Sequence, residues 1–509
     1  MANGDYFEGE PMRIGHVPQL LLDEHTVEDR WNLTRVSIQP VKFAGNPIMV
    51  PDQPGEFNCY DCHVIRDEPR GTMMMWYQDA DIEETFRGRL PADPDSAEHH
   101  ADFCRYAESD NGVHWTKPAL GLLKHRGSDR NNIVLAGVKE CDRSSIVVNP
   151  DPDDVDRHYI MGYLDAPKGE SGFCLAYSPD GIHWTPEPRN PVISGHYDCV
   201  NTPVWDPIRQ RWLWYGRPPV FAFGYSNLAK GWTDADPDSG LARHHRRRVS
   251  VSVSRDLVSW SKPRTVLYTD ERDADADWHD IDHFRPWFQN GVFLANACYV
   301  DPSGCAAGRL MLCWSHDGFH WHRPHDRAWL IEPGPDGAWD SGWVLGASAP
   351  VLMGNEMWFY YGAQRSEPHG MVHLATSVGL AKLPRDRFIA QRAGREPGYL
   401  LTREVVVEGN RLQLNTAPHA EKPVSRTAMA PMPDLRVELV ESAEGRGNVL
   451  GGHVIPGFSF DDCDVIRRNM FDCIVTWNGS DDLSALRGRS LHLRFRLSLT
   501  SLFTFAFAD

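Results

Sequence analysis

Six aspartates in this chain share a position that suits acid/base chemistry. Each stands just before, or at the start of, a short apolar segment of strand-forming character, and these segments recur along the chain. The six are Asp61, Asp142, Asp198, Asp280, Asp282 and Asp340. If the segments converge on one axis, the crowded carboxylates raise one another's pKa values, as proton transfer near neutral pH requires. For any single aspartate, the alternative is a strand-entry residue that bonds its own turn.

Histidine, arginine and tryptophan side chains accompany these acids. His63, His279 and His283 would meet on the same axis, where they could contact a ligand, act as acids or bind a metal ion. We expect them to contact substrate and expect no cofactor, with a metal on the axis as the alternative. Six further side chains are expected to bind or support the substrate: Arg143, Arg285, Trp339, Asp280, Asp282 and Asp340.

A repeated phrase defines the elements that would position these groups. A strand ends in Ser, an Asp-Gly or related turn follows, and then come Trp and usually Pro. Trp115, Trp184, Trp260 and Trp321 mark four copies at intervals of 69, 76 and 61 residues, and a degenerate fifth copy closes at Phe388. Asp-Gly suits a tight hairpin, and the Trp is expected to pack between neighbouring units.

Two further strand-like segments precede each phrase. The nearer one is rich in aromatic residues, as in 73–77, and the other is shorter, as in 62–65. Three or four strands per unit of about 65 residues are typical of a propeller blade, and segments of helical period are nearly absent. We predict an all-β fold with a five-bladed β-propeller over 56–403, whose last blade is completed by a strand from 1–55.

The character of the sequence changes from about residue 404. Segments such as Leu435–Leu439 and Leu491–Leu497 alternate apolar and polar residues with a period of two. This pattern predicts a C-terminal antiparallel β-sandwich over 404–509. Such a sandwich could be a lectin-like module or an element for packing and dimerisation.

Composition excludes several functional classes. The net charge of −18 argues against a nucleic-acid-binding surface, and no apolar run reaches membrane-spanning length. The N-terminus lacks the basic and apolar stretches of a secretory signal, so a cytoplasmic location is expected. Cys59 and Cys62 form a C-x-x-C without a second pair among the eleven cysteines, which favours free thiols in a reducing compartment.

Three motifs give the sequence a family resemblance. They are Leu-Leu-Leu-Asp-Glu at 20–24, Trp-Asp-Ser-Gly at 339–342 and Phe-Tyr-Tyr-Gly-Ala at 359–363. Together with the five phrases and the trailing sandwich, they resemble the five-bladed glycoside hydrolases of families 32, 43, 62, 68 and 117. The resemblance is nearest to family-32-like bacterial proteins and covers almost the whole chain.

The resemblance implies a glycoside hydrolase (glycosidase) with acids at the mouth of an axial funnel. Asp61 would be the base or nucleophile, Asp198 the general acid and Asp142 the orienting acid. The substrate would be a small sugar conjugate or oligosaccharide, with a furanoside as one candidate. The alternatives are a phosphorylase like those of family 130, and a non-catalytic propeller that binds carbohydrate or protein. In a binding module, we expect the acids to be spread apart or paired with arginine.

Overall fold

The computed structural model describes residues 10–80, 102–195, 202–217, 247–275, 280–300, 307–346, 349–365, 376–419, 432–441 and 452–509. Within these ranges the protein is all-β, with a single short α-helix, α3 (Glu271–Asp275). No helix in the described part is long and apolar enough to cross a membrane. The chain divides into two compact units. Unit 1 comprises Met1–Gln39, Gly354–Met357 and Leu383–Asp509, and unit 2 comprises Pro40–Met353 and Trp358–Lys382.

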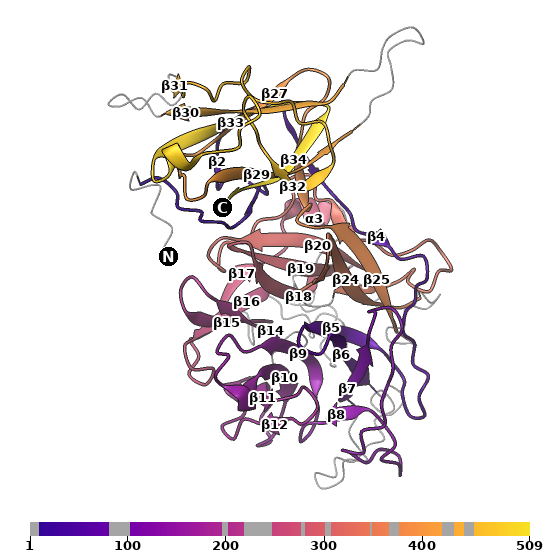
Figure 1. The fold of residues 1–509 in the computed structure, drawn as a ribbon. Helices are drawn as coiled ribbons and strands as arrows, with labels where there is room; N and C mark the ends of the chain where they lie inside the picture. The colour runs from indigo at the N-terminus through magenta and orange to yellow at the C-terminus, as the bar shows by residue number, and fades with distance from the viewer. Residues whose placement is uncertain are drawn as a thin grey trace. The chain divides into compact units, whose positions relative to one another are not determined.

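Five antiparallel sheets make up unit 2, apart from the ends of two strands (Figure 1). The first sheet is β5 (Tyr60–Asp67), β6 (Thr72–Ala80), β7 (Asp102–Ser109) and β8 (Ile133–Leu135). The second is β9 (Asp142–Val148), β10 (Tyr159–Asp165), β11 (Gly172–Ser178) and β12 (Thr185–Pro186), with β13 (Ile193–Ser194) beside β11. The third is β14 (Thr202–Asp206), β15 (Arg211–Gly216), β16 (Val249–Ser254) and β17 (Arg264–Leu267).

The last two sheets of unit 2 follow the same plan. The fourth is β18 (Asp280–Gln289), β19 (Val292–Val300), β20 (Gly308–Ser315) and β21 (Trp329–Ile331). The fifth is β22 (Val344–Gly346), β24 (Glu356–Ala363), β25 (Ser377–Pro384) and β4 (Val41–Lys42), with β23 (Val351–Met353) beside β24. The fifth sheet is therefore completed by a strand from near the start of the chain.

The first strands of the five sheets form a closed ring. β5 contacts β9, β9 contacts β14, β14 contacts β18, β18 contacts β22, and β22 contacts β5. Figure 1 shows β5, β9, β14 and β18 gathered in the middle of unit 2. Residues at the beginnings of these strands can therefore meet across the ring although they lie far apart in the sequence.

The repeated turns are built from side-chain to backbone hydrogen bonds. Asp180 Oδ1 accepts the amides of Ile182 and His183 at 2.9 and 2.8 Å, and Ser178 Oγ accepts the amide of Gly181 at 2.8 Å. Such bonds are the reason that Asp and Ser favour turns. The same bonds to Oδ1 recur in the turns of Asn111, Asp256 and Asp317.

In the four phrases that contain tryptophan, its ring packs against the preceding sheet of unit 2. This confirms the prediction that the tryptophan lies between neighbouring sheets. Each ring meets an aromatic ring of that sheet in an edge-on arrangement, and the first phrase meets the fifth sheet. The pairs are Trp184–Trp76 at 6.4 Å, Trp260–Phe173 at 5.9 Å, Trp321–Tyr215 at 5.6 Å and Trp115–Tyr360 at 5.8 Å. These contacts follow the order of the ring across four of its five junctions. Aromatic pairs of this geometry stabilise a structure beyond the burial of their surface.

Unit 1 contains two six-stranded sheets. One has the order β3 (Thr34–Ser37), β26 (Ile389–Arg392), β34 (Thr500–Ala508), β29 (Arg411–Pro418) and β32 (Met470–Ile474), with β1 (Gln19–Leu20) beside β34. The other has the order β2 (Val27–Trp31), β27 (Gly398–Thr402), β33 (Ser490–Ser498), β30 (Asp434–Glu441) and β31 (His453–Val454), with β28 (Val405–Val406) beside β33.

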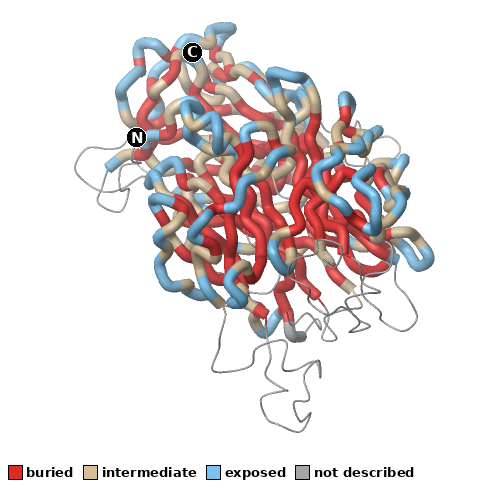
Figure 2. The backbone as a smooth tube through the Cα atoms, turned by 90° about the horizontal axis from the view of Figure 1, so that it is seen from below, coloured by how far each residue is buried: buried red, intermediate tan, exposed pale blue. Residues whose placement is uncertain are grey.

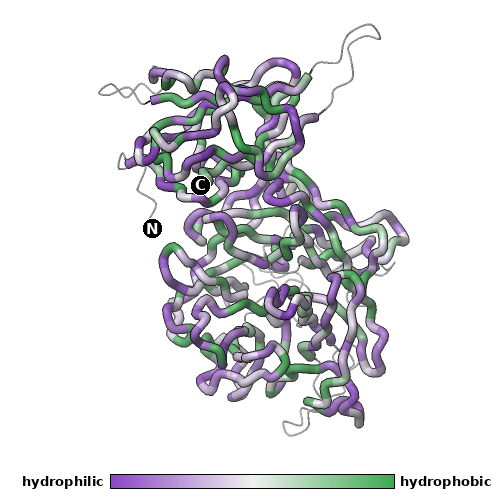
Figure 3. The backbone as a smooth tube through the Cα atoms, in the orientation of Figure 1, coloured by the Kyte–Doolittle hydropathy of each residue, from purple (hydrophilic) through white to green (hydrophobic). Residues whose placement is uncertain are grey.

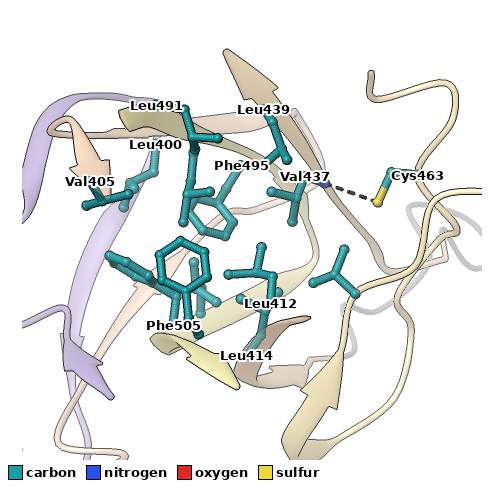
Figure 4. Packing of buried hydrophobic residues seen from close by; sticks show 14 of the residues in the cluster. Leu400, Val405, Leu412, Leu414, Val437, Leu439, Cys463, Leu491, Phe495 and Phe505 are labelled. Carbon is teal, nitrogen blue, oxygen red and sulfur yellow. Dashed lines mark hydrogen bonds between the residues drawn. The ribbon is translucent and has the colours of Figure 1, made fainter. Parts of the chain in front are cut away.

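The core of unit 1 follows from the alternation in its strands. Leu400, Leu412, Val437, Phe495 and Phe505 are fully buried together, as Figure 4 shows. Along β29 and β33 the buried apolar residues alternate with partly exposed ones over part of each strand, whereas almost all of β34 is buried. Figure 3 colours the strands of unit 1 by hydropathy. In both units the buried residues follow the strands and the exposed ones follow the loops (Figure 2).

The division of the chain differs from the expected one. A strand from 1–55 was expected to complete the propeller, and β4 pairs with β25 in the fifth sheet. The other strands of that segment, β1, β2 and β3, pair with β34, β27 and β26 in unit 1. Unit 1 also resumes at Leu383 rather than 404, because β26 and β27 already pair with its C-terminal strands.

Candidate functional site

Irregular strand starts position the charged side chains of the ring. Asp61 in β5 and Arg143 in β9 have φ angles of 46° and 53°, and they are the only described non-glycine residues with positive φ that lie inside strands. The register of both strands shifts at these points. A bulge redirects a side chain from the regular alternation, and a positive φ is uncommon for such residues. β18 shifts register in the same way just before His283.

These bulges bring Asp61 against groups from two other sheets. Its carboxylate lies 3.0 Å from Arg143 Nη1 of the second sheet, and 3.3 Å from both Arg285 Nη2 and His283 Nε2 of the fourth. The side chain of Asp61 is fully buried. We call these four residues the Asp61 group. The structure thus joins four of the residues that the sequence placed at the site.

The charges around Asp61 keep its carboxylate ionised. Burial alone would raise its pKa, but the hydrogen bond from His283 and the positive charges of Arg285 and Arg143 outweigh burial and hold the pKa well below its usual range. Burial also lowers the pKa of His283 to about 4, so its imidazole is neutral at pH 7. The two arginines therefore supply the positive charge that faces Asp61 at neutral pH.

His63 lies two residues after Asp61 in β5. It is fully buried, and burial with the nearby Arg285 holds its pKa well below the ordinary value for histidine. The Ile146 amide of β9 lies 3.4 Å from its Nδ1, and its Nε2 has no hydrogen-bond partner among the described residues. His63 is thus a neutral imidazole with one polar atom left for a ligand.

Arg285 connects four sheets through one guanidinium. Its Nη2 lies against Asp61 of β5. Its Nη1 donates to Ser145 Oγ of β9 and, at 3.3 Å, to Thr202 Oγ1 of β14. The two hydroxyls lie 3.1 Å apart. Sequence reasoning did not identify Ser145 and Thr202, because nothing local distinguishes them from ordinary strand residues.

A second ion-pair cluster surrounds Asp282. Its carboxylate pairs with Arg217 Nη2 at 2.6 Å, with Arg247, and with Nδ1 of His283 at 2.7 Å. Asp280 accepts the Arg247 amide at 2.7 Å. Asp280 and Asp282 were expected to bind substrate hydroxyls, and the described contacts are to arginine and histidine. His283 therefore lies between the two carboxylates Asp61 and Asp282.

Asp142 and Asp102 add two acids beside Arg143. Asp142 lies 3.2 Å from Arg143 Nε. Burial, together with the charges of Asp142 and Glu140, raises the pKa of Asp102 well above the ordinary value. Environments that push two carboxyl pKa values apart are how acids and bases are assigned in hydrolases. Sequence reasoning missed Asp102, although its position at the start of β7 was a usable signal.

Asp340 and Trp339 contact strands of the fifth sheet. Asp340 pairs with Lys42 Nζ at 2.5 Å and accepts the Tyr361 hydroxyl at 3.2 Å. Trp339 stacks on Tyr361 with ring centres 5.8 Å apart. These contacts tie Asp340 to β4 and β24, and its side-chain partners in the described part of the chain are not members of the Asp61 group.

Two expected site residues, Asp198 and His279, lie outside the described residues. Within the described ranges, no group of three or more His, Cys, Asp or Glu side chains is placed to hold a metal ion. The nine described cysteines are all free and buried, as predicted for that part of the chain.

An apolar pocket of about 380 Å³ lies toward the other ends of the same strands. Its wall includes Val64 of β5, Val147 of β9, Val204 and Trp205 of β14, and Trp287 of β18. The strands thus carry charged groups near their beginnings and apolar groups further along. Thr202, which accepts a hydrogen bond from Arg285, also belongs to the wall of this pocket.

Comparison with known proteins gives distant similarities. No protein-family model matches the sequence. A stretch of 316 residues is 25% identical to the A type blood N-acetyl-alpha-D-galactosamine deacetylase of Flavonifractor plautii, and the match covers 56% of this chain. It covers 37% of that protein, so the chain spans little more than a third of the relative's length.

Similar solved structures include two sugar complexes. One is an N-acetylgalactosamine deacetylase from F. plautii with blood group B trisaccharide, with a TM-score of 0.43, 15% identity, and coverage of 70% of this chain and 96% of that one. Another is the beta-1,2-mannobiose phosphorylase from Listeria innocua with beta-1,2-mannobiose, with a TM-score of 0.47, 11% identity, and coverage of 68% and 97%.

Proposed function

We propose that unit 2 is a five-bladed β-propeller and that its Asp61 group is the active site of a carbohydrate-active enzyme, a glycoside hydrolase. One observation carries the proposal. A fully buried carboxylate, Asp61, is held ionised by arginines from two other sheets, and one of these, Arg143, also acts on a second carboxyl, Asp102, whose pKa is raised. Glycoside hydrolysis needs such a pair, one carboxylate ionised and one carboxylic acid protonated.

The roles follow from the direction of each pKa. Asp61, with its low pKa, serves as the nucleophile or as the base that takes a proton from water. The general acid, which protonates the oxygen of the leaving group, is Asp198 or Asp102, and Asp142 orients Arg143. His63, whose Nε2 has no partner among the described residues, bonds a sugar hydroxyl, and His283 positions Asp61. The chain's own side chains carry these steps without an added cofactor.

The similarity to a sugar-modifying enzyme supports a carbohydrate ligand. The deacetylase of F. plautii acts, by its name, on an N-acetylgalactosamine group, and its match runs through more than half of this chain. We therefore propose an oligosaccharide or sugar conjugate as the substrate. Ser145, Thr202, His63 and His283 are of the residue types that bond hydroxyl groups.

A second candidate function is supported by the arginines around two carboxylates. Asp61 pairs with Arg143 and Arg285, and Asp282 pairs with Arg217 and Arg247. Acids paired with arginine are the arrangement expected of a non-catalytic sugar-binding propeller. Buried pairs of this kind fix geometry without requiring turnover. The two functions differ in whether removing the charge of Asp61 abolishes a reaction or only weakens binding.

The test is a screen of aryl furanosides and pyranosides with the Asp61→Asn variant. If Asp61 is the nucleophile or base, activity of the wild-type protein on at least one substrate falls by about three orders of magnitude or more in the variant. Asp206→Asn, which removes a buried carboxylate paired with Arg211 at the end of β14, is the matched control and retains activity. The hydrolase proposal is rejected if Asp61→Asn keeps wild-type turnover. It is also rejected if the wild-type protein binds the glycosides but cleaves none of them.

A further inference from the structure

The outer face of one sheet in unit 1 carries three neighbouring aromatic rings. Trp31 ends β2 and pairs in register with Tyr399 of β27, with ring centres 6.2 Å apart. Tyr399 in turn lies 6.3 Å from Phe460. We call Trp31, Tyr399 and Phe460 the aromatic platform. The Trp31 residue is 64% exposed, although an apolar ring of this size is normally covered in a folded protein.

The position of Trp31 is fixed by its surroundings. Asn32, at the turn after β2, donates from Nδ2 to the carbonyl of Pro397 at 3.0 Å. A side chain at Gly398 would meet the Asn32 carbonyl at 2.5 Å, so glycine permits this close approach. The turn therefore holds Trp31 against Tyr399, and the platform exists before any ligand binds, which lowers the entropic cost of binding.

Hydrogen-bonding groups continue the row of the platform across the sheet. Tyr399 pairs in register with Arg496 of β33, and Arg496 pairs with Arg436 of β30. Arg496 lies over the Phe460 ring at 5.2 Å, and Arg436 donates to the Phe460 carbonyl at 3.0 Å. Both guanidinium groups lie 3.5 Å from Asp434. The row thus runs from the rings of Trp31 and Tyr399 to the guanidinium groups of Arg496 and Arg436.

We propose that this face binds a neutral oligosaccharide chain, at a site separate from the Asp61 group. A sugar ring presents a C–H face that packs on aromatic rings and an edge of hydroxyls that bonds arginine and aspartate. Three rings in a row suit consecutive sugar units. Arg496 and Arg436 share Asp434, and Arg494 pairs with Glu438 at 2.5 Å, so three arginines face two carboxylates. Because each of these guanidinium groups is already paired with a carboxylate, a neutral chain fits this face better than an anionic one.

The same face is poorly suited to a protein partner. The core of a protein interface is depleted of charged residues, whereas Trp31 is bordered by Asp29, Arg30 and the Arg496–Asp434 pair. In the described part of β2, Trp31 is the one large exposed apolar side chain. An interface with a second copy of the chain is nevertheless a measurable outcome of the test.

The test is calorimetric titration of the full chain with four neutral probes: cellohexaose, mannohexaose, maltohexaose and arabinohexaose. We expect at least one to bind, and Trp31→Ala to raise its Kd at least tenfold, which is about 1.4 kcal/mol. Arg496→Ala should weaken binding several-fold. Tyr268→Ala, which removes an aromatic residue of 60% exposure in unit 2, is the matched control and should leave the Kd unchanged.

Three results would overturn the proposal. The first is that none of the four probes binds at millimolar concentration. The second is that Trp31→Ala binds with the wild-type Kd. The third is that light scattering shows an oligomer of the wild-type protein that Trp31→Ala dissociates, in which case the platform is an interface between copies of this chain.

Discussion

Replacing Asp61 by Asn should destabilise unit 2 strongly. The change removes one negative charge and keeps the size and the backbone preference of the side chain, because Asn tolerates a positive φ as well as Asp does. It leaves Arg285, which is fully buried, and Arg143, which is 12% exposed, facing a neutral amide. Removing one partner of a buried ion pair costs about 3–5 kcal/mol. Two arginines face this carboxylate, so we expect the loss to lie in that range.

Differential scanning calorimetry of the full chain measures this loss. Unit 2 contains roughly 340 residues, so its transition should shift by about 1.4 °C per kcal/mol and fall by about 4–7 °C in this variant. Asp154→Asn is the matched control, since its 2.6 Å pair with Arg157 is half exposed. Such surface pairs contribute about 0–1 kcal/mol, so this variant should melt close to the wild type.

A double variant separates the charge effect from general damage. In Asp61→Asn combined with Arg285→Gln, one unpaired cation is also removed, so the loss should be smaller than the sum of the two single losses by about 0.5–3 kcal/mol. The effect of Asp61→Asn should also be constant between pH 5 and 8. The lowered pKa of Asp61 means that its contribution is present above the unfolded-state value near 4 and is lost below it. Strictly additive losses, or an unchanged transition in Asp61→Asn, would refute the argument.

Three further predictions concern other parts of unit 2. Because burial lowers the pKa of His283 to about 4, the unfolded chain binds a proton between pH 6.5 and 4 that the folded chain does not. Thermal stability should therefore fall across that window by up to about 3 kcal/mol at 1.36 kcal/mol per unit, and His283→Gln should flatten the fall. Gly181→Ala should lower the melting temperature, because a Cβ at φ +79° would meet the Trp76 ring at 2.5 Å, whereas Gly71→Ala meets nothing within 4 Å and should cost less. Buried thiols with raised pKa values, such as Cys62 at about 12, should not react with a thiol reagent until urea unfolds the chain, and rapid labelling of Cys62 in the native protein would contradict this.

The repeated phrase made the sheets of unit 2 predictable from the sequence. The division of the chain between unit 1 and unit 2 was not predictable in this way. Each Ser-x-Asp-Gly turn and Trp is a local signal, and the structure shows the predicted bonds and ring contacts at Asp180 and Trp184. The pairing of β2 with β27 joins residues almost 370 positions apart, and its alternation does not reveal which edge it will join. The segment 1–55 was predicted to supply the strand that completes the last sheet, which β4 does, whereas the partners of β1, β2 and β3 were not predicted.

The residues of the site were predictable by type, and their partners were not. Asp61, Arg143, His283 and Arg285 were named from the beginnings of the strands, and they do meet. Their contacts depend on bulges in β5, β9 and β18, which shift each side chain away from the regular alternation. A bulge leaves no clear mark in a single sequence without a glycine at that point. For that reason the pairing of Asp61 with arginine could be seen only in three dimensions.

The low pKa of Asp61 excludes this residue as the general acid. A carboxylate that stays ionised under two arginines cannot deliver a proton near neutral pH, so a hydrolase built on Asp61 needs a second carboxyl. Asp102 has the raised pKa that this role requires. If Asp102 is the acid, the rate falls at alkaline pH as it ionises, and Asp102→Asn removes this limb of the profile and slows cleavage of substrates with poor leaving groups most. If Asp102→Asn retains the alkaline limb and the wild-type preference for leaving groups, while Asp198→Asn loses both, the acid is Asp198. The pH–rate profiles of these two variants on an aryl glycoside with a good leaving group and on one with a poor leaving group therefore decide between the two.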